Sequence, residues 1–170
     1  MLKPRFLILL VIVLLVAAAR FLPHPPNFTP IAAMALFGGA FFADKRMAYV
    51  VTLGAMFISD LFLGFHGTMA FVYGAFIITI FLGTKMAGKV TAGTVLGGAI
   101  GSSVLFYILT NFGVWLTSAY YPLTWAGLIS CYVAAIPFFH YTLAGTLIYS
   151  AVLFGGFEFA RRRVPALQLP

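Results

Sequence analysis

The chain has 170 residues, of which 63% are hydrophobic and only 8% are charged. Soluble domains carry about 25% charged residues, so this composition excludes an ordinary soluble enzyme, a coiled coil, a disordered chain and a nucleic-acid-binding module. An integral membrane protein remains, and because one spanning helix needs roughly 20 residues, the chain has room for about six of them.

The first apolar run, residues 6–22, predicts a spanning helix. Two interpretations stay open, because the small residues at 17–19 also suit the cleavage site of a signal peptide. We favour a retained span, since the apolar pattern continues through Leu22. Four prolines between Pro23 and Pro30 then predict a stiff loop. Pro30 suits the first position of the following helix.

The rest of the chain alternates between apolar runs and short polar or charged segments. Lys45 and Arg46 follow one run, and Lys85 and Lys89 follow another. The run 126–160 is interrupted only by Pro137 and is too long for one straight span, so an additional short helix is expected near 127–136. We therefore predict one all-α membrane domain over residues 1–170, with six spans at about 6–22, 30–43, 47–65, 68–84, 91–116 and 140–160.

The net charge of +7 fits a membrane topology better than it fits nucleic-acid binding. If the chain spans the bilayer six times, nine of its ten basic residues fall on the side of the termini and only Arg20 falls on the other side. Cytoplasmic loops retain Lys and Arg, so we expect both termini in the cytoplasm.

Two stripes of small residues predict close helix contacts. Ala35, Gly39 and Ala43 are spaced four apart, and so are Gly93, Gly97 and Gly101. Small residues let membrane helices approach closely, so each stripe indicates either packing within the bundle or a docking face for a partner membrane protein. The sequence leaves both interpretations open.

Polar groups at the expected outer depth are the candidates for a binding site. Asp60 is the only acid within a predicted span, and a carboxylate in hydrocarbon has to be paired, protonated or exposed to a watery cavity. It either pairs with Arg20 or a helix end, or contacts a ligand. The aromatic residues near 120–125 suit an interfacial belt or a wall that stacks on a flat ligand. The predicted substrate-binding residues are His24, Asn27, Asp60, Asn111, Tyr121, Trp125 and His140.

We expect neither an enzyme nor a cofactor or metal. The single cysteine, Cys131, excludes an internal disulfide and a cysteine-based zinc cluster. The three histidines match no local metal-ligand spacing. The chain contains no Gly-x-Ser-x-Gly elbow and no phosphate-binding Gly-Lys-Ser/Thr loop. Cys131 near His140 is the only conceivable pair of nucleophile and base.

Three segments carry a resemblance: LPHPPNFTPIAA at 22–33, ISDLFLG at 58–64 and CYVAAIPFF at 131–139. They resemble a family of small bacterial six-span membrane proteins, which is similar in turn to the substrate-binding S components of energy-coupling factor (ECF) vitamin transporters. The resemblance implies a six-helix bundle in the bacterial inner membrane that captures a vitamin or similar small organic molecule from outside.

The resemblance also implies a partner, because S components dock through small membrane-helix residues onto a transmembrane coupling protein powered by two ATPases. The stripe Ala35, Gly39 and Ala43 is the matching candidate, although the family places its Ala-x-x-x-Ala motif in the first helix. The alternative function is a structural or assembly protein of the membrane that binds no ligand.

Overall fold

The computed structural model describes residues 4–164 and 167, and every element within that part of the chain is helical. This confirms the predicted all-α class. The elements are α1 (Pro4–Ala18), the 3-10 helix η1 (Ala19–Phe21), α2 (Ile31–Phe41), α3 (Lys45–Leu63), α4 (Met69–Met86), α5 (Ala92–Thr117) and α6 (Trp125–Arg163). The ends of α3, α4 and α5 lie within two residues of the predicted spans.

Five helical segments of the described chain are long and apolar enough to cross a membrane: α1 with η1, α3, α4, α5 and α6. Large apolar side chains cover their outer surfaces. Phe62 is 77% exposed, Leu15 is 66% exposed and Val152 is 63% exposed. Such a surface suits lipid rather than water, which supports a multi-span membrane protein.

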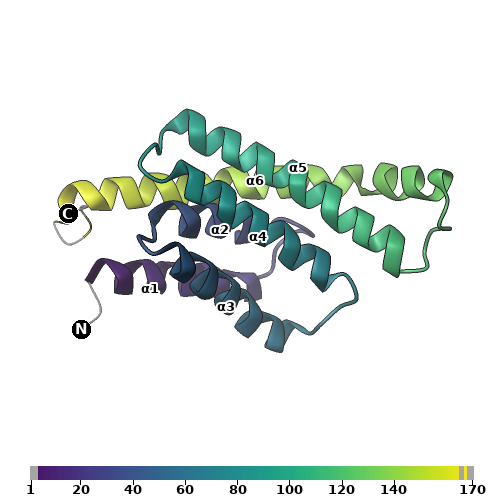
Figure 1. The fold of residues 1–170 in the computed structure, drawn as a ribbon, viewed down its shortest axis with the longest axis horizontal. Helices are drawn as coiled ribbons and strands as arrows, with labels where there is room; N and C mark the ends of the chain where they lie inside the picture. The colour runs from purple at the N-terminus through teal and green to yellow at the C-terminus, as the bar shows by residue number, and fades with distance from the viewer. Residues whose placement is uncertain (1–3, 165–166, 168–170) are drawn as a thin grey trace.

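The helices run up and down along one long axis, so that both ends of the chain lie at the same end of the bundle (Figure 1). The turns from α2 to α3 and from α4 to α5 also lie at this end. Arg5, Lys45 and Arg161 line one shallow hollow there. We call this end, with its basic side chains, the basic end. At the opposite end, the hairpin of α5 and α6 extends beyond the other helices (Figure 1).

The shortest of these helices, α2, forms the centre of the bundle. All eleven of its residues are buried, and it contacts α1, α3, α4, α5 and α6. At 1.5 Å per residue it is about 16 Å long, which is well short of the roughly 30 Å hydrocarbon core. The expected span at 30–43 is therefore a buried inner helix that needs no lipid-facing surface.

Glycine lets α2 and α4 meet backbone to backbone. A Cβ atom added to Gly39 would lie 2.2 Å from the Ile80 carbonyl oxygen, and one added to Gly83 would lie 2.3 Å from the Leu36 carbonyl oxygen. Ala35 is also fully buried. Ala35 and Gly39 thus pack inside the bundle, so the prediction of a partner-docking face at these two residues is wrong. Of that stripe only Ala43, beyond the end of α2, is exposed.

The second small-residue stripe, Gly93, Gly97 and Gly101, faces away from the other helices. Gly97 and Gly101 on α5 have no atom within 4 Å of an added Cβ, and Gly93 has only the side-chain oxygen of its neighbour Thr91, at 3.9 Å. All three glycines are exposed. This face of α5 therefore makes no close helix contact within the described bundle.

The expected break between a short helix at 127–136 and a span at 140–160 is absent, because α6 is one helix of 39 residues with Pro137 inside it. At 1.5 Å per residue it is about 58 Å long, and part of it projects with α5 beyond the other helices (Figure 1). Proline removes one backbone donor, but away from water the flanking peptide groups gain most by staying helical.

Three side-chain contacts to the backbone join α5 to the part of α6 before Pro137. The hydroxyl group of Tyr107 donates to the Tyr132 carbonyl, and the hydroxyl group of Tyr132 donates to the Ile108 carbonyl at 2.7 Å. The thiol of Cys131 donates to the Asn111 carbonyl at 3.4 Å. Cys131 is 2% exposed and serves packing between these helices.

Candidate binding site

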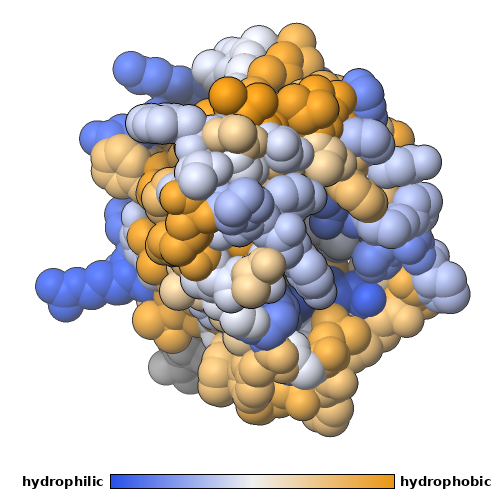
Figure 2. Space-filling model, turned by 90° about the vertical axis from the view of Figure 1, so that its right-hand side faces the viewer, coloured by the Kyte–Doolittle hydropathy of each residue, from blue (hydrophilic) through white to orange (hydrophobic). Residues whose placement is uncertain are grey.

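A cavity of about 340 Å³ lies at the end of the bundle opposite the basic end. Figure 2 looks onto this end, where hydrophilic side chains gather around a hollow and hydrophobic ones cover much of the remaining surface. The Pro-rich loop, the starts of α2 and α4 and the middle parts of α5 and α6 all contribute to its wall. Segments far apart in the sequence therefore meet at one site.

The wall combines polar groups with aromatic rings. Its amide and threonine hydroxyl groups come from four segments: Asn27, Thr29, Thr68, Thr110, Asn111, Thr142 and Thr146. Its rings belong to α4, α5 and α6: Phe76, Phe106, Tyr107, Phe138 and Phe139. Small-molecule sites typically have this combination of a mostly apolar wall and a few polar groups that orient the ligand.

Arg20 is the only Lys, Arg, Asp or Glu among the described residues of this wall. It lies in η1, directly after α1. Its Nη1 atom lies 2.7 Å from Oδ1 of Asp60 on α3, and the two side chains are 15% and 7% exposed. The same nitrogen donates to the Ser59 hydroxyl group and, at 3.4 Å, to the Met56 carbonyl. The ion pair thus fixes the end of α1 to α3.

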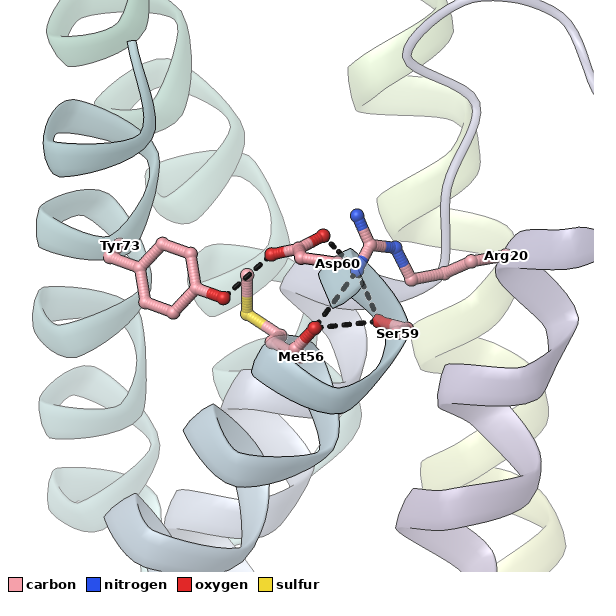
Figure 3. A network of polar contacts seen from close by, with 5 residues as sticks. All are labelled: Arg20, Met56, Ser59, Asp60 and Tyr73. Atoms are coloured by element: carbon pink, nitrogen blue, oxygen red, sulfur yellow. Dashed lines mark hydrogen bonds and ion pairs between the residues drawn. The ribbon is translucent and has the colours of Figure 1, made fainter. Parts of the chain in front are cut away.

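The Asp60 carboxylate has a partner on each oxygen. While Oδ1 faces Arg20, the Tyr73 hydroxyl group donates to Oδ2 at 2.6 Å. Tyr73 comes from α4, so the carboxylate bridges η1 and α4 (Figure 3). The Ser59 hydroxyl group donates to the Met56 carbonyl at 2.7 Å. A buried carboxylate is stable in a membrane protein when it is paired and hydrogen-bonded in this way.

Asp60 itself is not part of the cavity wall. Of the two interpretations that the sequence left open, the structure shows the pairing with Arg20. The carboxylate lies behind the guanidinium group, whose own side chain lines the cavity. Asp60 is therefore placed to position Arg20.

Two other predicted residues do line the cavity. Asn27 lies in the Pro-rich loop with a φ of 63°, a left-handed conformation that asparagine tolerates better than most residues. Asn111 lies on α5, where its Nδ2 atom donates to the Tyr107 carbonyl at 2.8 Å. The Oδ1 atom of Asn111 makes no hydrogen bond within the described part of the chain, so it can accept one from a ligand.

The remaining predicted residues lie outside the cavity wall. Trp125 begins α6 and is 81% exposed, which suits an interfacial aromatic belt. His140 is exposed on α6, and Tyr121 is half-buried in the loop before it. His24 is exposed in the Pro-rich loop, and its Nδ1 atom lies 3.0 Å from the Pro25 carbonyl oxygen. The structure does not bring these four residues together with Asn27 and Asn111.

Several residues of the wall are absent from the predicted set. His66 and Thr68 lie between α3 and α4, where the His66 Nδ1 atom is 2.9 Å from the Thr68 hydroxyl group. Thr142 and Thr146 are four residues apart on α6 and donate to the carbonyls of Phe138 and Thr142 at 3.1 and 2.8 Å. The spacing of these two threonines was the available signal, since it places both on one face of a helix.

No group of three His, Cys, Asp or Glu side chains in residues 4–164 is close enough to hold a metal ion. The wall offers hydrogen bonds, aromatic surface and one guanidinium group. These groups can orient and hold a small molecule.

Comparison of the sequence with known protein families finds a match over nearly the whole chain. A model of one family matches residues 1–167. The chain belongs to the DUF6580 family. This family has no known function. Neither the curated proteins nor the solved structures contain a match to the DUF6580 chain.

Proposed function

We propose that this DUF6580 protein binds a small organic molecule in the cavity and serves its uptake across the membrane, in the manner of an ECF S component. The cavity carries the proposal: a hollow of about 340 Å³ opens at one end of a bundle of apolar helices. Its volume lies in the range of roughly 300–1,000 Å³ that is common for small-molecule sites. A cavity of this volume can hold a vitamin or a compound of similar size.

The charge distribution supports capture from outside the cell. Arg5, Lys45 and Arg161 meet at the basic end, while the cavity lies at the other end. Basic residues mark the cytoplasmic side of membrane proteins. We therefore propose a multi-pass protein of the bacterial inner membrane, with both termini in the cytoplasm and the cavity facing outward.

An uptake function in this manner also calls for a coupling protein with ATPases. Ala35 and Gly39 of α2 are buried, so a coupling protein has to dock on a lipid-facing surface instead. Binding rather than catalysis is proposed for the cavity, because neither a cysteine nor a carboxylate is among the described residues of its wall.

The test is to purify the protein in a mild detergent, release bound small molecules and identify them by mass spectrometry. We expect one compound to co-purify with the wild-type protein. Asn111→Leu, which removes a polar group from the wall at similar volume, should reduce its amount at least tenfold. His140→Ala, outside the wall, should retain it.

Two results would contradict the proposal. One is a wild-type protein that carries no compound and whose melting temperature no small molecule raises, which favours a structural or assembly protein without a ligand. The other is equal loss in both variants, which places the ligand elsewhere on the molecule.

A further inference from the structure

We infer that the molecule held in the cavity is a small ring compound with a carboxylate group, and that Arg20 binds this group. The inference rests on the proposed function and names the substrate class of the same site. Four observations carry it: the charges of the wall, the contacts of the guanidinium group, the partners of Asp60 and the rings that face the cavity.

The charges of the wall favour an anion. Arg20 is its only Lys, Arg, Asp or Glu among the described residues. A cationic ligand would meet the Arg20 guanidinium group directly, because the Asp60 carboxylate that pairs with it lies outside the wall. In a site shielded by apolar helices, such a mismatch is costly because the effective dielectric constant is low.

The contacts of Arg20 leave one edge of its guanidinium group open. All of its described hydrogen bonds and its ion pair use the Nη1 atom, toward Asp60, Ser59 and Met56. The Nη2 and Nε atoms have no partner in residues 4–164 and 167, and Figure 3 shows a guanidinium nitrogen turned away from the carboxylate. Nε and Nη2 together present two parallel N–H groups, the fork that binds a carboxylate with two hydrogen bonds.

Asp60 does not compete for this edge. One of its oxygens faces Nη1 and the other accepts from Tyr73, and its side chain is 7% exposed. The carboxylate therefore holds the guanidinium group through Nη1 and leaves the Nε and Nη2 edge free, in a side chain that lines the cavity. Asp60 is a positioning residue in this arrangement and does not touch the ligand.

The rest of the wall determines the body of the ligand. Phe76, Phe106 and Phe139 provide apolar surfaces from three different helices, which suit a flat ring. The Asn111 Oδ1 atom and the threonine hydroxyl groups accept hydrogen bonds from ring substituents. A ring with a carboxylate at one end would place its ring against these aromatic side chains and its carboxylate at Arg20.

The experiment compares acids with their matched amides on the purified full chain. The probes are nicotinate against nicotinamide and benzoate against benzamide, with the shift of the melting temperature and its concentration dependence as the readout. Each pair shares its ring and differs in the charge of one group. We expect each acid to stabilise the wild-type protein at concentrations at least tenfold lower than its amide.

Two variants test the role of Arg20. Arg20→Gln combined with Asp60→Asn removes both charges of the pair together, and it should bring the acid and the amide within twofold of each other. Asp60→Asn alone keeps the guanidinium group and should retain the preference for the acid, so the test holds even where the double variant fails to fold. Arg162→Gln, at the basic end and outside the cavity, is the control and should behave as the wild type.

The outcomes separate this inference from the proposed function. Equal effects of acid and amide on the wild type, including no effect of either, overturn the inference. So does a co-purified compound that is neutral or cationic and depends on Asn111, in which case the proposed function stands. A protein that binds no small molecule at all contradicts the proposed function itself.

Discussion

At the scale of single residues, the ion pair of Arg20 and Asp60 both links helices of the bundle and positions the Arg20 side chain in the cavity wall. A buried charge pair seldom adds much stability, because both ions lose their hydration. Here the pair links η1 to α3, and Tyr73 extends the link to α4. The same pair holds Arg20, the one Lys, Arg, Asp or Glu among the described residues of the cavity wall, in place. Stability and binding are therefore expected to respond differently to the same substitutions.

The first prediction concerns the cost of breaking this pair. Arg20→Gln leaves the Asp60 carboxylate buried with Tyr73 as its remaining side-chain partner, which should destabilise the protein by about 3–5 kcal/mol. Asp60→Asn should cost less, because Arg20 still faces the cavity. The double variant Arg20→Gln/Asp60→Asn should be more stable than Arg20→Gln, because no lone charge remains.

Unfolding of the four proteins in detergent, followed as a double-mutant cycle, measures this coupling. Strictly additive effects of the two single substitutions would mean that the pair contributes no interaction energy.

At the scale of helices, the contact of α2 with α4 depends on two glycines that face each other's backbone. We predict that Gly39→Ala destabilises the protein by at least about 1–3 kcal/mol, because the added methyl group meets the Ile80 carbonyl oxygen and not a side chain that can rotate away. Gly97→Ala on α5 is the matched control. Its added methyl group meets no atom within 4 Å, and alanine favours a helix over glycine.

Thermal unfolding of the two variants in the same detergent checks this prediction. Gly97→Ala is expected to match or slightly exceed the wild type. A Gly39→Ala protein as stable as the Gly97→Ala protein would show that α2 and α4 can separate at little cost.

The sequence predicts where a helix begins and ends much better than it predicts the direction in which a side chain of that helix faces. Apolar runs between charged segments placed α3, α4 and α5 to within two residues, because hydrocarbon thickness limits the length of a span. His140 and Asn111 were both expected at the outer depth. Asn111 faces the cavity and His140 does not, since helix rotation is set by packing against neighbours.

The same limit applies to α2 and α6. The apolar run of α2 reads like a short span, and only its contacts with five other helices show that it is an inner helix. Pro137 predicts a break by local propensity, but α6 continues through it as one helix of 39 residues, and hydrogen bonds of Tyr132 hold the part before Pro137 against α5. In both cases tertiary packing overrides a local signal.

At the scale of the whole molecule, the proposed function depends on which side of the membrane the cavity faces. The basic end collects the chain termini and the turns between α2 and α3 and between α4 and α5 (Figure 1). Capture from outside requires this end to be cytoplasmic. Cysteine labelling in intact cells tests the orientation directly, because the one native cysteine is buried, with 2% of its surface exposed, and gives little background.

We predict opposite behaviour for two engineered cysteines. Tyr120→Cys, at a site that is 83% exposed in the loop between α5 and α6, should react with a membrane-impermeant maleimide in intact cells. Lys89→Cys, exposed in the turn before α5, should react only after the membrane is permeabilised, because basic loops stay in the cytoplasm. The reverse labelling pattern would show that the cavity faces the cytoplasm, which contradicts capture of a substrate from outside the cell.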